Sequence, residues 1–312
     1  MIRYLSLCSG IEAFSCAVHD MPEFVPVAFA EIEPFPCKVL AHHYPDVPNL
    51  GDITKINGAD YRGAVDLIVG GTPCQDFSVA GTRKGLAGER SGLAMHFVRI
   101  VGECRPRWVL WENVPGCTST PSHNPGGDFA AFLTALYELG YCIAYRILDA
   151  RFFGVPQRRR RVFLVGHLGN WRSAAEVLFE CQSLCGNPEP RRETWKEIAK
   201  CLTRGLGTRL DAETDTFAIS SIGQYTQTDI ACTLRAAGGD AGGGSENLVK
   251  YRQGIRRLTP IESERLMGFT DNYTLIPGAS DTARYKALGN SMAVPCMRWI
   301  AQRMAKVDKR IS

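Results

Sequence analysis

The sequence predicts an α/β fold with a mostly parallel sheet, accompanied by a smaller β-rich domain. Two observations lead to this fold class. Up to about residue 188, short apolar runs typical of strands alternate with segments of helical length and spacing, the pattern of a parallel sheet covered by helices. After residue 188 the chain becomes rich in Thr, Gly, Ser and Gln, and this alternation stops.

The elements of the first region can be assigned in chain order. The apolar runs that predict strands are Ile2–Leu7, Val25–Ala30, Val65–Val69, Trp108–Trp111, Ala144–Leu148 and Val162–Val165. The segments between them that predict helices are Glu33–His43, Leu93–Glu103 and Asp128–Leu139. Several of the strands end in small or polar residues, which is where open α/β folds place their ligands.

The region after residue 188 contains fewer regular elements. Between residues 189 and 252 only 194–202 reads as a helix, and the five glycines within 238–244 exclude a regular element there. Because strand-like residues flank these glycines, we interpret them as a loop inside a small β-rich domain rather than as a flexible linker. Helical periodicity returns at Pro260–Met267 and at Val294–Val307.

Composition restricts the class of protein. The 312 residues suggest two domains, at roughly 100 to 200 residues per domain, and the 45% hydrophobic and 22% charged residues exclude a disordered chain. No apolar run reaches the roughly 18 residues of a membrane helix, and no signal-peptide pattern opens the chain, so we expect a soluble, cytoplasmic protein. Cys181 and Cys185 lack the partners of a zinc site, so no metal is expected. The net charge of +4 permits a nucleic-acid partner without requiring one.

Polar residues that follow the first strands are candidates for binding a nucleotide-like ligand. Ser9, Gly10 and Ile11 form a turn of small residues between a strand and a helix, although one glycine is not the dinucleotide fingerprint. Glu31 follows the second strand, where a carboxylate can accept hydrogen bonds from ribose hydroxyls, and Asp52 follows a third expected strand end. Each acid could equally be an ordinary surface residue. Their order along the chain is what indicates an adenosine site.

The segment from Gly70 to Ser78 contains a candidate nucleophile. It directly follows an apolar strand, and Cys74 lies in it between constraining Gly and Pro residues. Backbone N–H groups of such a loop can favour a thiolate, whereas structural cysteines usually sit inside apolar runs. The glycines and charged residues of 80–92 suit a loop that closes over a substrate.

Three further segments could have either a functional or a structural role. Glu112 ends an apolar strand, where it could hold a proton or cap a helix. Arginines occupy 158–161, and alternation places Arg159 and Arg161 on one face with Gln157, as an anion site or as a solvated edge. The sequence 289–291, Gly-Asn-Ser, predicts the start of the last helix.

The order of these motifs resembles the cytosine-5 DNA methyltransferase family. The motifs are Pro73-Cys74-Gln75, Glu112-Asn113-Val114, Gln157-x-Arg159-x-Arg161, Arg256-Arg257-Leu258-Thr259-Pro260-x-Glu262 and Gly289-Asn290-Ser291. The resemblance covers both ends of the chain and leaves only the segment around 189–252 outside the common motifs. The opening motif is similar to a phage- and prophage-type branch. It departs from the usual family motif, which has an aromatic residue in place of Cys8 and glycines at positions 12 and 13.

The resemblance implies a Rossmann-like fold of S-adenosylmethionine-dependent methyltransferases. Its catalytic, cofactor-binding domain would comprise 1–188 and 281–312, and a small target-recognition domain would comprise 189–280. The implied reaction is methyl transfer from S-adenosyl-L-methionine, which becomes S-adenosyl-L-homocysteine, to carbon 5 of a cytosine flipped out of duplex DNA. Carbon 5 is a poor nucleophile until a thiolate adds at carbon 6, which is the role expected for Cys74.

The resemblance also implies roles for individual residues. Glu112 would contact ring nitrogen 3 and the exocyclic amine, Arg161 the carbonyl oxygen of the base, and Arg159 the loop and a phosphate. The expected cofactor-binding residues are Ser9, Gly10, Ile11, Glu31, Ile32, Asp52, Pro73, Asn290 and Ser291. The expected DNA-binding residues are Gln157, Arg158, Gln224, Tyr225, Arg235, Arg256 and Arg257. Double-stranded DNA is the expected partner of a monomer, with a cognate restriction endonuclease as a further candidate.

Three other functions compete with this prediction. A tRNA cytosine methyltransferase would use the same scaffold, but the long insertion before Arg256 favours a reader of duplex DNA. A catalytically silent DNA-binding protein would have no need for Cys74, Glu112 and Arg161 together. A nicotinamide oxidoreductase would need the three-glycine spacing that the first turn lacks.

Overall fold

The computed structural model describes residues 1–73, 92–118, 127–179, 218–222, 224–228, 231–232, 247–251 and 254–311. The chain divides into two compact units. Unit 1 consists of Met1–Leu148, Arg160–Gly186 and Met297–Ser312, and unit 2 consists of Asp149–Arg159 and Asn187–Cys296. The predicted helix at 194–202, the glycines at 238–244 and nearly all of the closing loop at 80–92 lie outside the described residues.

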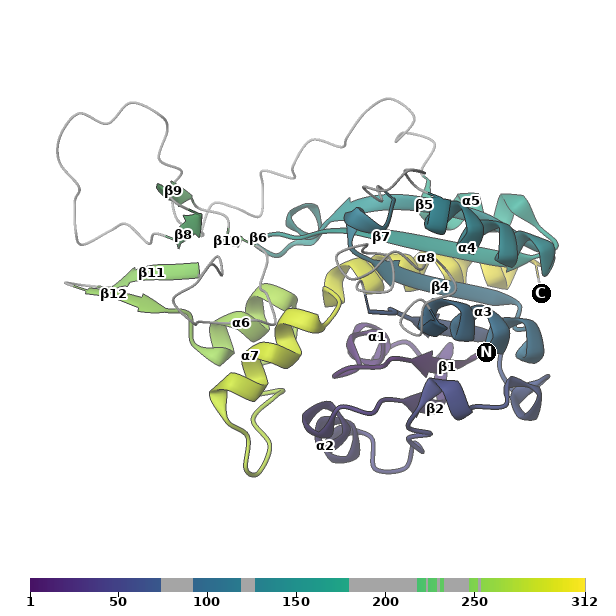
Figure 1. The fold of residues 1–312 in the computed structure, drawn as a ribbon, viewed down its shortest axis with the longest axis horizontal. Helices are drawn as coiled ribbons and strands as arrows, with labels where there is room; N and C mark the ends of the chain where they lie inside the picture. Colours follow the sequence, from purple (N-terminus) through teal and green to yellow (C-terminus); the bar gives the residue numbers. More distant parts are fainter. Residues whose placement is uncertain are drawn as a thin grey trace. The chain divides into compact units, whose positions relative to one another are not determined.

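Unit 1 is built on a six-stranded sheet with the order β2-β1-β3-β4-β7-β5 (Figure 1). Its strands are β1 (Ile2–Leu7), β2 (Phe24–Ala30), β3 (Leu67–Gly70), β4 (Trp108–Asn113), β5 (Tyr141–Asp149) and β7 (Arg160–Leu168). β1 pairs in parallel with β2 and β3, and β3 pairs in parallel with β4, whereas β7 is antiparallel to β4. This sheet confirms the predicted α/β fold with a mainly parallel sheet.

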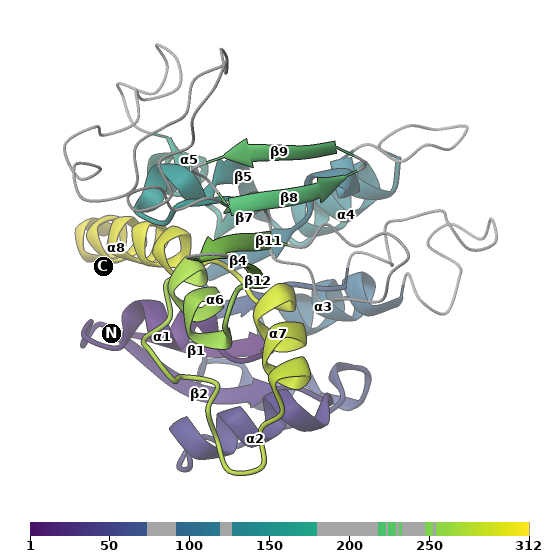
Figure 2. The same ribbon diagram turned by 90° about the vertical axis from the view of Figure 1, so that its left-hand side faces the viewer.

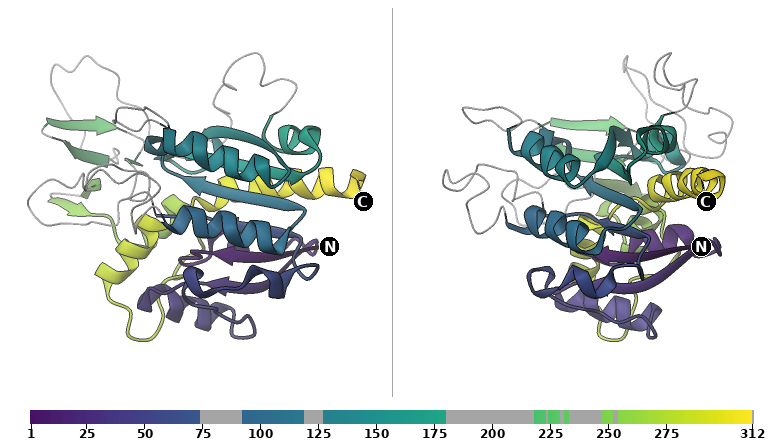
Figure 3. Two further views of the ribbon diagram at one scale, coloured as in Figure 1. Left: turned by 45° about the vertical axis from the view of Figure 1, so that its right-hand side comes forward. Right: turned by 90° about the vertical axis from the view of Figure 1, so that its right-hand side faces the viewer.

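Helices cover both faces of this sheet. The helices are α1 (Ala13–Val18), α2 (Pro34–His43), α3 (Gly92–Cys104), α4 (Gly127–Glu138), α5 (Trp171–Leu178) and α8 (Val294–Ile311), with short 3₁₀ helices η1 (Ile53–Lys55), η2 (Gly58–Tyr61), η4 (Pro115–Thr118) and η5 (Ala150–Phe153). In Figure 3, α3 and α4 lie on one side of the sheet and α5 and α8 on the other. Helix α3 buries Ala94, Phe97, Val98 and Val101, whose spacing places them on one helical face.

The core of unit 1 lies between the sheet and these helices. Trp111 from β4 packs against Phe132 from α4 with ring centroids 4.6 Å apart, and both side chains are fully buried. Three residues earlier on β4, the indole N–H of Trp108 donates to Oδ1 of Asp308 at 2.7 Å. The last helix is therefore bonded to a strand that lies 200 residues earlier in the chain.

The described residues of unit 2 form a four-stranded sheet and the helices α6 (Pro260–Met267) and α7 (Asp281–Asn290). The sheet has the order β12 (Gly254–Arg257), β11 (Asn247–Tyr251), β8 (Ala218–Ile222) and β9 (Gln224–Thr228), and each neighbouring pair is antiparallel (Figure 2). A two-residue strand β6 (Gln157–Arg158) pairs in parallel with β10 (Ala231–Cys232). Helices α6 and α7 lie side by side.

The start of α6 and the end of α7 show how local sequence sets these helices. At α6, Thr259 and Glu262 form a capping box, with each side chain accepting from the other residue's backbone N–H. Residues 289–291 lie just before the last helix, as predicted, but the expectation that Asn290 or Ser291 caps the start of that helix is wrong. Gly289 and Asn290 end α7, and the backbone N–H of Ser291 donates to Ala287 and Leu288, so these residues close one helix before α8 begins at Val294.

Candidate active site

The carboxyl ends of four parallel strands meet at one edge of the unit 1 sheet. In the strand register Leu7 lies beside Ala30 and Gly70, and Gly70 lies beside Trp111. The residues that follow these strand ends are the ones singled out in the sequence. Such an edge is where open α/β folds bind ligands.

The turn after β1 is bonded to the end of β2. Ser9 Oγ accepts the backbone N–H of Ala30 at 3.1 Å, and the Ser9 N–H donates to the Ala30 carbonyl at 3.0 Å. The N–H of Gly10 donates to Oε2 of Glu31 at 2.7 Å. Ser9, Gly10 and Glu31 therefore form one small constellation, and their binding of a cofactor stays a prediction.

The carboxylate of Glu31 is held in a fixed orientation. Its Oε1 accepts the backbone N–H groups of Ile32 and Glu33, both at 2.8 Å. Asn49, which the sequence analysis did not identify, also holds Glu31 in place. Its Oδ1 accepts the N–H of Glu31 at 3.0 Å, and its Nδ2 donates to the Glu31 carbonyl at 3.1 Å. Nothing in the local sequence around Asn49 signals this contact, because it depends on a partner 18 residues away.

The constellation fits the ribose and amino-acid parts of an adenosyl ligand. A Cβ atom added at Gly10 would have no atom within 4 Å, so there is open space beside the turn. Glu31 offers carboxylate oxygens beside this space, the acceptor that ribose hydroxyls require. Ile32, the next residue, has 68% of its surface exposed and is free to lie against a flat ring.

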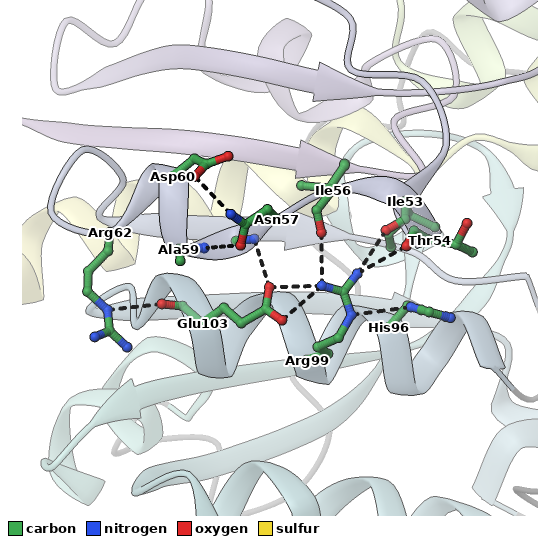
Figure 4. A network of polar contacts seen from close by, with 11 residues as sticks. Ile53, Thr54, Ile56, Asn57, Ala59, Asp60, Arg62, His96, Arg99 and Glu103 are labelled. Atoms are coloured by element: carbon green, nitrogen blue, oxygen red, sulfur yellow. Dashed lines mark hydrogen bonds and ion pairs between the residues drawn. The ribbon is translucent and has the colours of Figure 1, made fainter.

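Asp52 has a local structural role and a position beside the same sheet edge. Its Oδ1 accepts the N–H of Thr54 at 2.9 Å and caps η1, which lowers the pKa of its carboxyl. Figure 4 shows how Arg99 of α3 fixes the segment that follows. The Arg99 guanidinium donates to the carbonyl of Ile56 at 2.9 Å and to Glu103, whose Oε2 accepts the N–H of Gly58 at 2.7 Å.

The strand that leads to Cys74 is bonded to the strand that carries Glu112. The Thr72 hydroxyl accepts the indole N–H of Trp111 at 3.2 Å, and the Thr72 carbonyl accepts the amide of Asn113 at 3.0 Å. On the other side of β3, Gly70 allows the close approach of β1, since a Cβ there would lie 2.7 Å from the Leu7 carbonyl oxygen. Pro73 is exposed at the end of this described segment, and Cys74 lies outside the described residues.

Glu112 and Arg161 form an ion pair at the end of β4. The Nε atom of Arg161 lies 3.1 Å from Oε1 of Glu112, and their side chains are only 14% and 10% exposed. The two residues come from antiparallel neighbouring strands, β7 and β4. A carboxyl group and a guanidinium are therefore presented together, next to the strand that leads to Cys74.

In unit 2 the arginine segment alternates as predicted, with Gln157 and Arg159 buried and Arg158 exposed. Arg159 Nη2 donates to the carbonyls of Gly289 at 3.0 Å and Ser291 at 2.5 Å, so it holds the turn that contains exposed Asn290. Gln157 is fully buried, and its amide donates to the Leu266 carbonyl at 3.0 Å. This burial argues against a direct contact between Gln157 and DNA.

The remaining DNA-binding candidates are placed by their backbone alone or lie outside the described part. Gln224 and Tyr225 begin β9, and Arg256 and Arg257 end β12. Arg235 lies outside the described residues. Among the residues that the structure does describe, no cluster of His, Cys, Asp and Glu could hold a metal, and no helix has the length and apolar character to cross a membrane.

Comparison with known proteins identifies sequence relatives along nearly the whole chain. The family model for C-5 cytosine-specific DNA methylases matches residues 2–180 and 182–306. Type II methyltransferase M1.ScrFI from Lactococcus lactis subsp. cremoris is 31% identical over 98% of this chain and 78% of its own length. A protein of Escherichia phage P1 described as a DNA N-6-adenine-methyltransferase is also 31% identical, over 97% of this chain, which spans only 61% of that protein.

Solved structures share the fold. The methyltransferase EhMeth of Entamoeba histolytica superposes with a TM-score of 0.69 at 15% identity, covering 98% of both chains. DNMT2 of Spodoptera frugiperda superposes with a TM-score of 0.68 at 20% identity, covering 98% of this chain and all of that one. At these identities the structures show a common fold and no more.

Proposed function

The chain belongs to the C-5 cytosine-specific DNA methylase family, which makes it a DNA cytosine-5 methyltransferase, and we propose that it acts on a flipped cytosine through a covalent adduct with Cys74. The observation that carries this proposal is the buried Glu112–Arg161 pair at the end of β4. Thr72, two residues before Cys74, is bonded to Trp111 and Asn113 on either side of Glu112. These bonds support a site in which a thiol, a carboxyl and a guanidinium act on one base.

The first step activates carbon 5 of the cytosine. The Cys74 thiolate adds to carbon 6, and the electron pair of the 5,6 double bond becomes available at carbon 5. Glu112 supplies a proton at ring nitrogen 3, which compensates the negative charge that moves into the ring. Arg161, held beside Glu112, donates to the carbonyl oxygen of the base, where part of that charge also resides.

S-Adenosylmethionine supplies an electrophilic methyl group on a sulfonium when it is bound. Ser9, Gly10 and Ile11 would face its methionine part, and Glu31 would accept the ribose hydroxyls. Ile32 would lie against the adenine and Asp52 would face its amino group. Pro73, Asn290 and Ser291 are the remaining proposed cofactor residues. After transfer, a base removes the proton from carbon 5, the Cys74 thiolate is eliminated, and ring nitrogen 3 returns its proton to Glu112, which restores the free enzyme.

Duplex DNA is the proposed substrate, and its target base must leave the stack because carbon 6 is inaccessible within a duplex. The exposed arginines Arg158 and Arg257 are suited to phosphate contacts, which carry most non-specific affinity for DNA. Gln224, Tyr225, Arg235 and Arg256 are proposed to contribute to recognition. A cognate restriction endonuclease is a proposed biological partner, as the Type II names of several relatives suggest.

A DNA adenine-N6 methyltransferase is the second candidate, because the phage P1 relative is described as one. The amine of adenine could attack a methyl sulfonium directly, and that reaction needs no thiolate. Incubation of the protein with labelled S-adenosylmethionine and duplex DNA, followed by nucleoside analysis, separates the two. We expect 5-methylcytosine, no N6-methyladenine, and no transfer with tRNA.

The covalent step is tested with two further samples. Cys74→Ser should lose all methyl transfer, and DNA with 5-fluorocytosine at the target should form a cofactor-dependent adduct with the protein, since fluorine cannot leave as a proton does. Methylation of cytosine by Cys74→Ser would exclude the proposed nucleophile. An active enzyme that forms no adduct would exclude the covalent route.

A further inference from the structure

Glu12 is a fully buried carboxyl group in the turn that follows β1. Its side chain is 1% exposed, and its Oε1 accepts the backbone N–H of Ser15 at 3.2 Å, which caps α1. The other oxygen, Oε2, is buried and receives no well-aligned hydrogen bond within the described part of the chain, although the Ser6 side chain interacts with the carboxyl. Leaving a buried carboxylate oxygen without a well-aligned hydrogen bond is costly, so this arrangement calls for a reason beyond capping.

The backbone at Glu12 is also unfavourable for a residue with a side chain. Glu12 has φ 62° and ψ 60°, the left-handed conformation that glycine adopts most easily. The family's usual motif has glycine at this position, which suits that backbone. Strain of this kind persists mainly where it serves a function, and a cap alone would not require a glutamate.

The groups around Glu12 disfavour its negative charge. The titratable groups that interact with Glu12 include Tyr4 on β1 and Glu31 after β2, and Tyr4 in turn lies near Cys16 on α1 and Tyr44 after α2. Burial raises the pKa of Glu12 to about 7, and the charge of Glu31 adds to the rise, against hydrogen bonding from the serines at positions 6 and 15. Burial and the Glu31 charge both favour the neutral form of the carboxyl.

We propose that Glu12 is a positioning residue of the cofactor turn, which holds a proton in the free protein and releases it when the positively charged methyl donor binds. The inference rests on the proposed function, because it takes the donor to be S-adenosylmethionine and the turn at Ser9, Gly10 and Ile11 to be its methionine site. Glu12 is the next residue in this turn, and the Gly10 N–H is bonded to Glu31, the same carboxylate that opposes ionisation of Glu12.

The consequence is a preference for donor over product. The donor carries a sulfonium cation, and its demethylated product carries an uncharged thioether. Only the donor therefore brings an additional positive charge that stabilises the Glu12 carboxylate through a medium of low dielectric constant. Donor binding would release a proton to solvent, and product binding would not. Glu12 would thereby favour exchange of spent product for new donor.

Isothermal titration calorimetry of the full chain tests this proposal directly. Donor and product are each titrated at pH 7 in buffers with different ionisation enthalpies, so that the slope of the observed enthalpy gives the protons exchanged. We expect the unsubstituted protein to release about half a proton more with donor than with product, as a group with a pKa about 7 implies. Glu12→Gln, which keeps the shape and the cap acceptor, should abolish this difference and reduce the donor-to-product affinity ratio several-fold.

A second variant and a pH series complete the test. Glu12→Gly, whose backbone is suited to the left-handed turn, provides a second non-titrating variant if Glu12→Gln does not fold. In the unsubstituted protein, the donor-to-product affinity ratio should rise with pH through the range around 7. Equal proton release for both ligands in the unsubstituted protein, or a donor–product difference that persists unchanged in Glu12→Gln, would overturn the inference while leaving the proposed cofactor intact. Absence of donor binding in all proteins would overturn the proposed cofactor itself.

Discussion

At the residue scale, Glu112 and Arg161 depend on each other for their state and position. Both are mostly buried, so each charge lacks the stabilisation that water would give and is compensated by the other at 3.1 Å. In the proposed reaction, the same groups exchange this pairing for hydrogen bonds to the base. The pair keeps two polar groups oriented at the strand end where we propose that the base binds.

Glu112→Gln tests the carboxyl of this pair. The amide preserves size but cannot supply a proton to a ring nitrogen, so we expect kcat to fall by about 10²- to 10⁴-fold while DNA still binds. Methyl transfer under saturating cofactor is the measurement, and Arg172→Ala, at an exposed position on α5, is the control. Activity within a few-fold of the unsubstituted protein would show that Glu112 has no chemical role.

The raised pKa of Glu12 predicts that the cofactor-free protein loses stability as the pH rises. Its pKa is raised from 4.5 to about 7 on folding, so its contribution to stability is fully present below pH 4.5 and is lost as the pH rises through 7. At about 1.4 kcal/mol per pKa unit, the loss amounts to about 3 kcal/mol. Denaturant unfolding at pH 5 and pH 8 should show this loss relative to Glu12→Gln. Parallel stability curves for the two proteins would contradict it.

At the element scale, the periodic segments were the predictable part of the fold. The strand Ile2–Leu7 and the helix Pro260–Met267 match their predicted bounds because each is continuous, apolar or well capped. Helix α7 was missed because its ten residues include polar side chains on several sides and its buried face is formed by contacts with α6. The turn at Gly289 was then assigned to the wrong helix.

In the candidate site too, features set by the local sequence could be predicted, whereas features set by contacts with distant residues could not. The positions of Glu112 and Glu31 could be predicted, since Glu112 lies near the carboxyl end of the apolar strand β4 and Glu31 directly follows β2, at the edge where parallel sheets bind ligands. The burial of Gln157 and Arg159 could not, because their partners lie 109 and about 130 residues further along the chain. Cys74 was identified from its motif and lies outside the described residues, so its role stays a prediction.

The packing of α6 against α7 rests on a buried ion pair. Arg284 of α7 donates to Oε1 of Glu264 at 3.1 Å and to the Thr274 hydroxyl at 2.9 Å, and all three side chains are buried. Arg284→Met should therefore lower the free energy of unfolding by about 3 to 5 kcal/mol, because it leaves the Glu264 charge uncompensated.

The matched control is Arg265→Met, whose partner is Asp271 at an exposed site on the same helix pair. An exposed ion pair contributes at most about 1 kcal/mol. Urea denaturation of both variants measures the contrast. Similar losses for the two variants would mean that the buried pair contributes no more than a surface pair.

At the scale of the whole molecule, unit 1 is assembled from three stretches of chain that include both ends. Its last stretch, within α8, is bonded to early elements: Arg298 donates to Asp20 at 2.7 Å, and Asp308 accepts from Trp108. The sheet edge that carries Glu112 therefore belongs to a unit that is complete only when the end of the chain has packed against β4. The residues of unit 2 lie between these stretches in the sequence, so the sequence of unit 2 can vary without interrupting the sheet of unit 1.

Asp308→Ala tests whether this closure matters for the edge that binds the substrate. Asp308 is 5% exposed and accepts from the buried indole of Trp108 at 2.7 Å, while its other oxygen lies 3.2 Å from Arg107. Removing it leaves a buried N–H without an acceptor and should cost about 1 to 3 kcal/mol of stability. Lys309→Ala, at the exposed neighbouring position, should change stability by less than about 0.5 kcal/mol.

The indole reports the change directly, since Trp108 fluorescence should shift at lower denaturant concentration in Asp308→Ala. If the two variants unfold at the same denaturant concentration, the bond between the C-terminal helix and β4 does not stabilise unit 1. The assembly of unit 1 from separate stretches of chain would then have no effect on its stability.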